Sequence, residues 1–69
     1  MTRKSKIEYL NKNAVGVKIE AEFNSKLGRL IVKSIQVGDS KFTYTTHSRD
    51  QADAGLVIDH MYWEETRNQ

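Results

Sequence analysis

The clearest hydrophobic pattern in the chain is a strict alternation that runs from residue 15 to residue 23. Every second side chain is apolar, and these residues are Val15, Val17, Ile19, Ala21 and Phe23. A two-residue period is typical of a β-strand that buries one face and leaves the other in water. Asn24, Ser25 and Gly28 follow as turn formers. The pattern therefore predicts a strand that ends in a hairpin.

Two further strands are predicted after this turn. Residues 29–37 are mostly apolar, and residues 41–47 are rich in aromatic and β-branched side chains, as strands are. Gly38 and Asp39 lie between these segments and suit a tight turn, since both residue types tolerate the backbone angles that it needs. The three segments together predict a small antiparallel meander.

Helical spacing replaces the strand pattern after residue 48. Apolar side chains recur at intervals of three and four, at Ala54, Val57, Ile58, Met61 and Tyr62. Leu56 and Trp63 widen this stripe on one side. Such a stripe is typical of an amphipathic helix that packs on a core, so we expect a helix from about residue 49 to residue 65.

The start of this helix carries its own signals. Ser48 followed by Gln51 matches a capping box, in which two side chains satisfy free backbone N–H groups. Asp50 and Asp53 lie in or near the first turn, where the helix dipole favours negative charge. Gly55 costs about 1 kcal/mol relative to alanine inside a helix. We expect this glycine to let the helix lie close against the sheet.

The N-terminal segment fits two predictions. Ser5 and Glu8 form a second capping-box pattern, and Ile7 and Leu10 suit one face of a helix of two turns or fewer. Residues 6–10 also alternate as an edge strand would. We therefore predict an α+β fold, a three- or four-stranded antiparallel sheet with the C-terminal helix packed on one face. We expect one domain over residues 1–69, with residues 1–4 and 66–69 frayed.

The second strand is apolar on both of its faces. In a regular strand Leu30 and Val32 point one way, while Ile31, Ile35 and Val37 point the other way. A single helix covers only one face of a sheet, so two explanations remain open. Either a β-bulge kinks the strand, or a second cover exists. That cover would be the N-terminal segment, a second copy of the chain or a partner protein.

Small size and the lack of cysteine limit what this chain can be. A chain of 69 residues buries only roughly 60% of the surface that its unfolded form exposes. The absence of cysteine excludes disulfides and thiolate zinc sites and fits a reducing compartment. There is no signal-peptide pattern and no apolar run of membrane length. We expect a soluble, cytoplasmic protein that is complete as given.

Candidate catalytic residues are few and scattered. Only two histidines are present, His47 and His60, and a metal site would need at least one more ligand. Glu20 and Glu22 share one face of an open strand, without the apolar pocket that acid–base catalysis by a carboxylate pair requires. Ser48 is accounted for by capping, and no glycine-rich phosphate loop occurs. The sequence predicts a protein that is not an enzyme and uses no metal and no cofactor.

Charge is distributed unevenly along the chain. Residues 1–41 hold nine lysines and arginines against four acids, a balance of +5, whereas residues 42–69 hold two against five, a balance of −3. The basic residues that would contact nucleic acid are Arg3, Lys4, Lys6, Lys12, Lys26, Arg29 and Lys33. Several such phosphate contacts would make the affinity strongly salt-dependent.

The element order resembles that of double-stranded-RNA-binding domains. Residues 35–52, IQVGDSKFTYTTHSRDQA, resemble the second hairpin and final helix start of that family in spacing. The resemblance implies an α-β-β-β-α fold that binds RNA. The family carries a Gly-Pro-x-His element in its first hairpin and lysines at the final helix start. This chain has NSKLG and SRDQAD at those places, so no family residue is carried over.

A second resemblance is to small DNA-binding domains of phage integrases and plant transcription factors. These also consist of three strands and a helix, and they read the major groove with the sheet. The corresponding face of this chain would hold the basic residues Lys18, Lys33 and Lys41 together with Thr43. It would also hold the acidic residues Glu20 and Glu22. The mixed charge is unlike a phosphate-binding surface.

We favour binding to another protein, because the helix start is acidic and the net charge is only +2. The candidate partner-binding residues are Asp50, Asp53, Asp59, Trp63, Glu64, Leu30 and Val32. The sequence thus predicts a small protein that docks on a protein or macromolecular complex and modulates or inhibits it. Proteins of this size and kind are common among phage and mobile-element accessory proteins. A homodimer is compatible with this prediction, and a nucleic-acid-binding regulator is the alternative.

Overall fold

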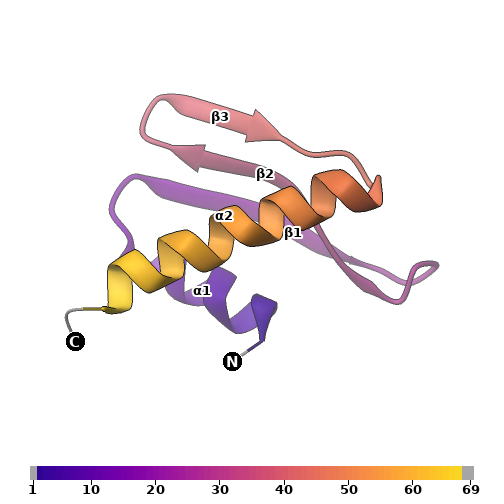
Figure 1. Cartoon of the computed structure of the whole chain (residues 1–69), viewed down its shortest axis with the longest axis horizontal. Helices are drawn as coiled ribbons and strands as arrows, with labels where there is room; N and C mark the ends of the chain where they lie inside the picture. The colour runs from indigo at the N-terminus through magenta and orange to yellow at the C-terminus, as the bar shows by residue number, and fades with distance from the viewer. Residues whose placement is uncertain (1, 68–69) are drawn as a thin grey trace.

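The fold consists of a three-stranded sheet with two helices on one of its faces (Figure 1). The computed structural model describes residues 2–67. Its elements are, in chain order, α1 (Arg3–Asn13), β1 (Val17–Asn24), β2 (Arg29–Val37), β3 (Ser40–Thr43) and α2 (Ser48–Thr66). The strands are antiparallel in the order β1-β2-β3. The predicted α+β meander is confirmed, and the N-terminal segment is a helix rather than an edge strand.

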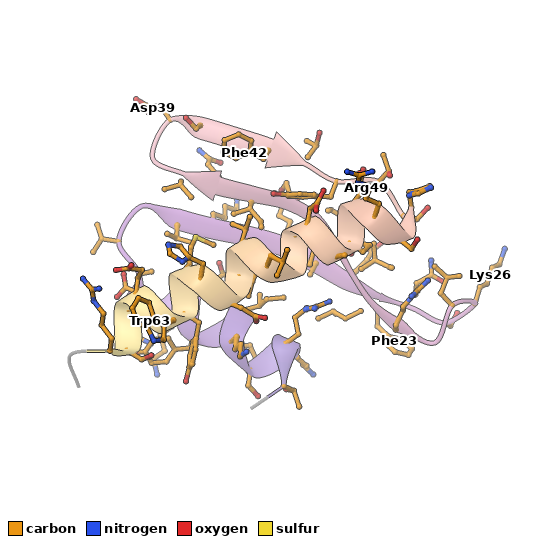
Figure 2. The ribbon with its side chains drawn as sticks, in the orientation of Figure 1. Phe23, Lys26, Asp39, Phe42, Arg49 and Trp63 are labelled. Carbon is orange, nitrogen blue, oxygen red and sulfur yellow. The ribbon has the colours of Figure 1, made fainter. Side chains whose placement is uncertain are left out.

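The core lies between the helices and the two longer strands. Its buried members are Ile7, Leu10, Ala14, Ile19, Val32, Ile35, Ala54 and Ile58. Strand β3 contributes none of them, and its Phe42 is exposed (Figure 2). The helices therefore cover β1 and β2, while β3 forms an uncovered edge of the sheet.

α1 is longer than predicted and is capped by a different residue. It has about three turns over 11 residues, whereas two turns or fewer were expected. Thr2 is the N-cap, and its hydroxyl accepts a hydrogen bond from the Ser5 N–H at 3.2 Å. The predicted Ser5–Glu8 capping box is therefore wrong, because Ser5 already lies inside the helix.

α2 begins one residue earlier than predicted, and this changes its capping. His47 is the N-cap, and its ring Nδ1 accepts a hydrogen bond from the Arg49 N–H at 3.2 Å. Ser48 is already helical, so Gln51 falls on the buried side of the helix. The predicted Ser48–Gln51 capping box is therefore wrong. Asp50 does lie in the first turn, as predicted.

Several other boundaries differ from the prediction. Val15 precedes β1 and is 99% exposed, although the alternation assigned it to the strand. β3 ends at Thr43 rather than near residue 47. Arg3 and Lys4 belong to α1 and Thr66 to α2, and fraying of these ends stays a prediction. Residue 1 and residues 68–69 lie outside the described residues.

A β-bulge explains why β2 is apolar at both odd and even positions. Two consecutive residues of β1 pair with Val32 and Ser34, so Lys33 is an extra residue without a partner on β1. An extra residue reverses the alternation of the side chains that follow it. Val32 and Ile35 are three positions apart, yet both are fully buried in the same core.

The bulge corrects the predicted faces of β2. Leu30 and Val32 lie on the same side of the sheet as Ile35 and Val37, not on the opposite side. Of the two explanations left open, the bulge is the correct one for these four residues. Ile31 lies on the other face, where it pairs with a glutamate of β1 and is also buried.

Two side-chain amides bind backbone groups of the sheet that no strand pairs with. Gln51 Oε1 accepts a hydrogen bond from the Val32 N–H, and Nε2 donates to the Val32 carbonyl, both at 2.9 Å. Nε2 also donates to the Thr45 carbonyl at 2.7 Å. Asn11 binds Ile19 of β1 in the same way, at 2.7 and 3.0 Å. Each amide takes the place of a residue on a neighbouring strand. Gln51 does so on β2, beyond the end of β3, and Asn11 does so on the outer edge of β1.

We expect Gln51→Ala to lower the free energy of unfolding by about 2–4 kcal/mol, because it leaves the buried N–H and carbonyl of Val32 without partners. Gln36→Ala is the matched control, since Gln36 makes a single hydrogen bond, to the Gly38 carbonyl at 3.3 Å. The control should cost less than about 1 kcal/mol. Urea unfolding followed by circular dichroism measures both. Equal losses would contradict the role assigned to Gln51.

Deletion of Lys33 is expected to unfold the protein, because removing the extra residue returns Leu30 and Val32 to the solvent face. Lys33→Ala keeps the bulge and removes only an exposed ion pair with Glu22, so the unfolding midpoint should hardly change. The comparison is made by thermal unfolding and by the dispersion of the amide NMR spectrum. A deletion variant with a native-like spectrum would show that the bulge is dispensable.

Candidate protein-binding surface

The acidic residues predicted to bind a partner differ in how free they are. Asp50 accepts hydrogen bonds from the Thr45 N–H at 3.0 Å and from the Thr45 hydroxyl at 2.7 Å. These bonds hold the pKa of the Asp50 carboxyl below its ordinary value, with the hydroxyl as the larger cause. Asp50 therefore closes the β3–α2 turn and is already engaged within the fold.

Two other predicted acids are ion-paired. Asp59 lies 2.9 Å from the Lys6 ammonium and so connects α2 to α1. Glu64 lies 3.4 Å from the Arg67 guanidinium and 3.8 Å from the His60 ring nitrogen Nε2. Asp53 is exposed, and its carboxylate makes no hydrogen bond or ion pair within residues 2–67. Of the predicted acids, Asp53 is the one that remains fully available.

The two apolar residues predicted to bind a partner lie in or against the core. Val32 is 0% exposed, and Leu30 is half-buried and packs against the core cluster. The assignment of Val32 to a partner surface is corrected, because its side chain is fully buried in the core, whereas Leu30 stays partly accessible on the same face of the sheet. A side chain that is fully buried in the core cannot contact a partner.

Apolar surface is instead exposed on the outer side of α2. Leu56 is 68% exposed and Trp63 is 55% exposed. They are seven residues apart, which is about two helical turns on one side of the helix. Trp63 lies beside the His60 ring, with centroids 6.5 Å apart, and the Arg67 guanidinium lies 5.2 Å from its ring centroid. We call Leu56, His60, Trp63 and Arg67 the outer ridge of α2.

The sequence analysis missed Leu56 because it assigned this residue to the buried stripe. A signal was present, since Leu56 stands two positions from both Ala54 and Ile58, which are 0% exposed. Two residues correspond to about 200° of helical rotation, so these neighbours cannot share a face with it. Trp63 was predicted for the partner surface, and it lies exposed near the end of α2 (Figure 2).

The basic residues predicted to bind nucleic acid lie on α1, in the β1–β2 turn and on β2. Lys6 is paired with Asp59, and Lys33 lies 2.8 Å from Glu22. The hydrogen bond and the charge of Glu22 raise the pKa of Lys33. The other five make no ion pair within the part of the chain that the structure describes. They are Arg3, Lys4 and Lys12 on α1, and Lys26 and Arg29 at the β1–β2 hairpin.

Gly55 makes room for the Arg3 side chain. The expectation that it lets α2 lie close against the sheet is therefore wrong. A Cβ atom on Gly55 would meet the Arg3 guanidinium, which lies directly against this point of α2. Arg3 thereby reaches from the first turn of α1 to the middle of α2.

A cavity of about 680 Å³ lies between the start of α1 and the β1–β2 hairpin. Its lining residues are Thr2, Arg3, Lys4, Ala21, Glu22, Phe23 and Leu30. Phe23 is 65% exposed, and it lies near the hairpin tip that carries Lys26 (Figure 2). We call this cavity the α1–hairpin groove. It combines an apolar floor with two cations.

Residues 2–67 hold neither a metal-ligand cluster nor a membrane-spanning helix. No three His, Asp or Glu side chains in this range are grouped so that they could hold a metal ion. Neither α1 nor α2 is both long and apolar enough to cross a membrane.

Comparison of the chain with protein-family models, with curated proteins and with solved structures finds no match.

Asp50 is expected to make the stability of the fold depend on acid. Its pKa is lower in the folded protein than its ordinary value of 3.8, so its charge stabilises the fold above that value. This contribution is lost as the pH falls through the folded pKa. When the pH is lowered from about 7 to about 2, the unfolding midpoint of the Asp50→Asn variant should therefore fall less than that of the wild type. Asp53→Asn, which leaves the Thr45 bonds intact, is the control and should behave as the wild type does.

Proposed function

We propose that this protein is a non-enzymatic binding module that docks on another protein through the outer ridge of α2. The observation that carries the proposal is the exposure of Leu56 and Trp63 on the side of α2 that faces away from the core. With more than half of their surface in water, these side chains contribute little to folding. A protein partner that removed both from water would gain affinity from them.

The composition of the ridge supports a protein as the ligand. Tryptophan and arginine are enriched at the residues that contribute most to protein–protein affinity. Trp63 and Arg67 lie together here, and Glu64 stands beside them at 3.4 Å from the Arg67 guanidinium. An aromatic anchor with a charged rim is the usual anatomy of an interface. The adjacent acids Asp53 and Glu64 favour a partner with basic groups around an apolar pocket.

The proposal also covers how the protein acts, in which compartment it acts and to which class of protein it belongs. A chain of 69 residues has little material with which to enclose a water-free reaction site, so action by contact is the simplest expectation. A cysteine-free chain suits the cytoplasm. By size, the protein fits the accessory proteins of phages and mobile elements, which modulate or inhibit a larger partner.

Nucleic-acid binding is the less supported alternative. Two of the seven basic candidates, Lys6 and Lys33, are committed to carboxylates within the fold. The first turns of α2 present Asp50 and Asp53, which repel phosphate. The five free cations would have to act from α1 and the hairpin alone.

We expect Leu56→Ala and Trp63→Ala each to weaken partner binding about tenfold or more, because each removes one of the two large apolar contacts of the ridge. Both should leave the unfolding midpoint nearly unchanged, since both side chains are exposed. Val15→Ala is the matched control, because Val15 is equally apolar and fully exposed but lies in the turn before β1. The measurement is co-purification from the native host, with affinity then determined for the identified partner.

A salt titration against random duplex DNA and RNA tests the alternative. Micromolar binding that falls steeply with salt and is lost when Arg3 and Lys4 are neutralised would contradict the docking proposal. So would a partner that binds the Trp63→Ala variant as tightly as the wild type.

A further inference from the structure

The outer edge of β1 has backbone groups that no strand uses. β1 is an edge strand, because the sheet order is β1-β2-β3. The N–H and carbonyl of Ile19 both bind Asn11, so the backbone groups of Ile19 point away from β2. Along an antiparallel strand, the N–H and C=O groups of successive residues point to opposite edges of the strand. The N–H and carbonyl groups of Ala21 and Phe23 therefore face outward as well.

The α1–hairpin groove lies at this same edge. Ala21, Phe23 and Leu30 supply its apolar floor, and Arg3 and Lys4 supply cations from the first turn of α1. Neither cation makes an ion pair within residues 2–67.

The remaining charged residue in the groove does not neutralise these cations. Glu22 lines the groove, but its carboxylate is already paired with Lys33 at 2.8 Å. The groove thus offers free backbone groups, apolar surface and uncompensated positive charge in one place.

We propose that the α1–hairpin groove captures a short, extended, acidic peptide segment of a partner protein, which adds to β1 as a fourth strand. An extended peptide pairs with outward N–H and carbonyl groups that repeat every second residue, which a nucleic-acid strand does not do. The side chains of an added strand alternate between the two faces of the sheet. Those on the helix side meet Ala21 and Phe23, and a carboxylate among them reaches Arg3 or Lys4.

The geometry also limits the length of the peptide that can bind. Asn11 occupies the backbone groups of Ile19, so pairing along β1 is restricted to Ala21, Phe23 and the hairpin beyond. The ligand is therefore a segment of a few residues with an apolar and an acidic side chain two positions apart. This surface is separate from the outer ridge of α2, so the inference stands or falls independently of the proposed function.

The test is selection of binders from a random heptapeptide display library. We expect enriched peptides to contain an acidic residue two positions from an apolar one. In NMR titrations with a selected peptide, the amides of Ala21 and Phe23 should shift and their hydrogen exchange should slow. A library without enriched binders, or peptides that shift only the outer ridge, would overturn the proposal.

Two variants separate backbone pairing from charge. The double variant Arg3→Gln with Lys4→Gln should bind the selected peptides about tenfold or more weakly, while Lys12→Gln with Lys18→Gln, of equal net charge, should bind normally. Ala21→Pro removes an outward N–H that no neighbouring strand uses, so the fold should survive while peptide binding is lost. If the proline variant unfolds, the charge variants decide.

Retained affinity in the Arg3 and Lys4 double variant would show that the proposal is wrong. If the Trp63→Ala variant alone lost these peptides, the peptides would bind the ridge. The proposed function would then stand and this inference would fail. Tighter binding of a random single-stranded oligonucleotide at Phe23 would likewise overturn it in favour of a nucleic-acid ligand.

Discussion

The β-bulge at Lys33 is the constraint on which this fold depends. A regular β2 would direct half of its apolar side chains to each face, and a chain of 69 residues has no second layer to cover both. The extra residue brings Val32 and Ile35 to the same side of the sheet. Two helices on that side then suffice to form one core. Bulges are built-in features of a sheet and not defects, and here the bulge makes a single-sided core possible.

The short β3 and the open outer edge of β1 leave backbone groups, those of Val32 and Ile19, that side chains must satisfy. Gln51 and Asn11 do this with their side-chain amides, one on β2 and one on β1. Unpaired buried N–H and carbonyl groups are costly, so these two residues matter more than their polar character suggests. They also decide where the sheet stays open, since the stretch of β1 beyond Ile19 has no such amide. The candidate peptide site is therefore a consequence of how the sheet is completed elsewhere.

Charge that is segregated along the chain is mixed in space. The basic N-terminal helix lies beside the acidic C-terminal helix (Figure 1), and Lys6 and Asp59 pair between them at 2.9 Å. Lys33 and Glu22 pair across the two longer strands. The surface is thus no simple positive face. Of the seven basic residues predicted to bind nucleic acid, the five without an ion pair within residues 2–67 lie on α1 and at the hairpin. Two of them, Arg3 and Lys4, border an apolar groove that suits a mixed ligand.

The sequence by itself determined the elements. Local periodicity predicted β2 at its observed bounds and α2 to within one residue at each end, because these signals come from neighbours along the chain. Tertiary structure decided the features that depend on contacts between residues far apart in the sequence. It made His47 the N-cap, turned Gln51 to the backbone of Val32, and left Leu56 in solvent. A single inserted residue changes which side chains meet, and that choice is fixed only when strands pair and helices pack.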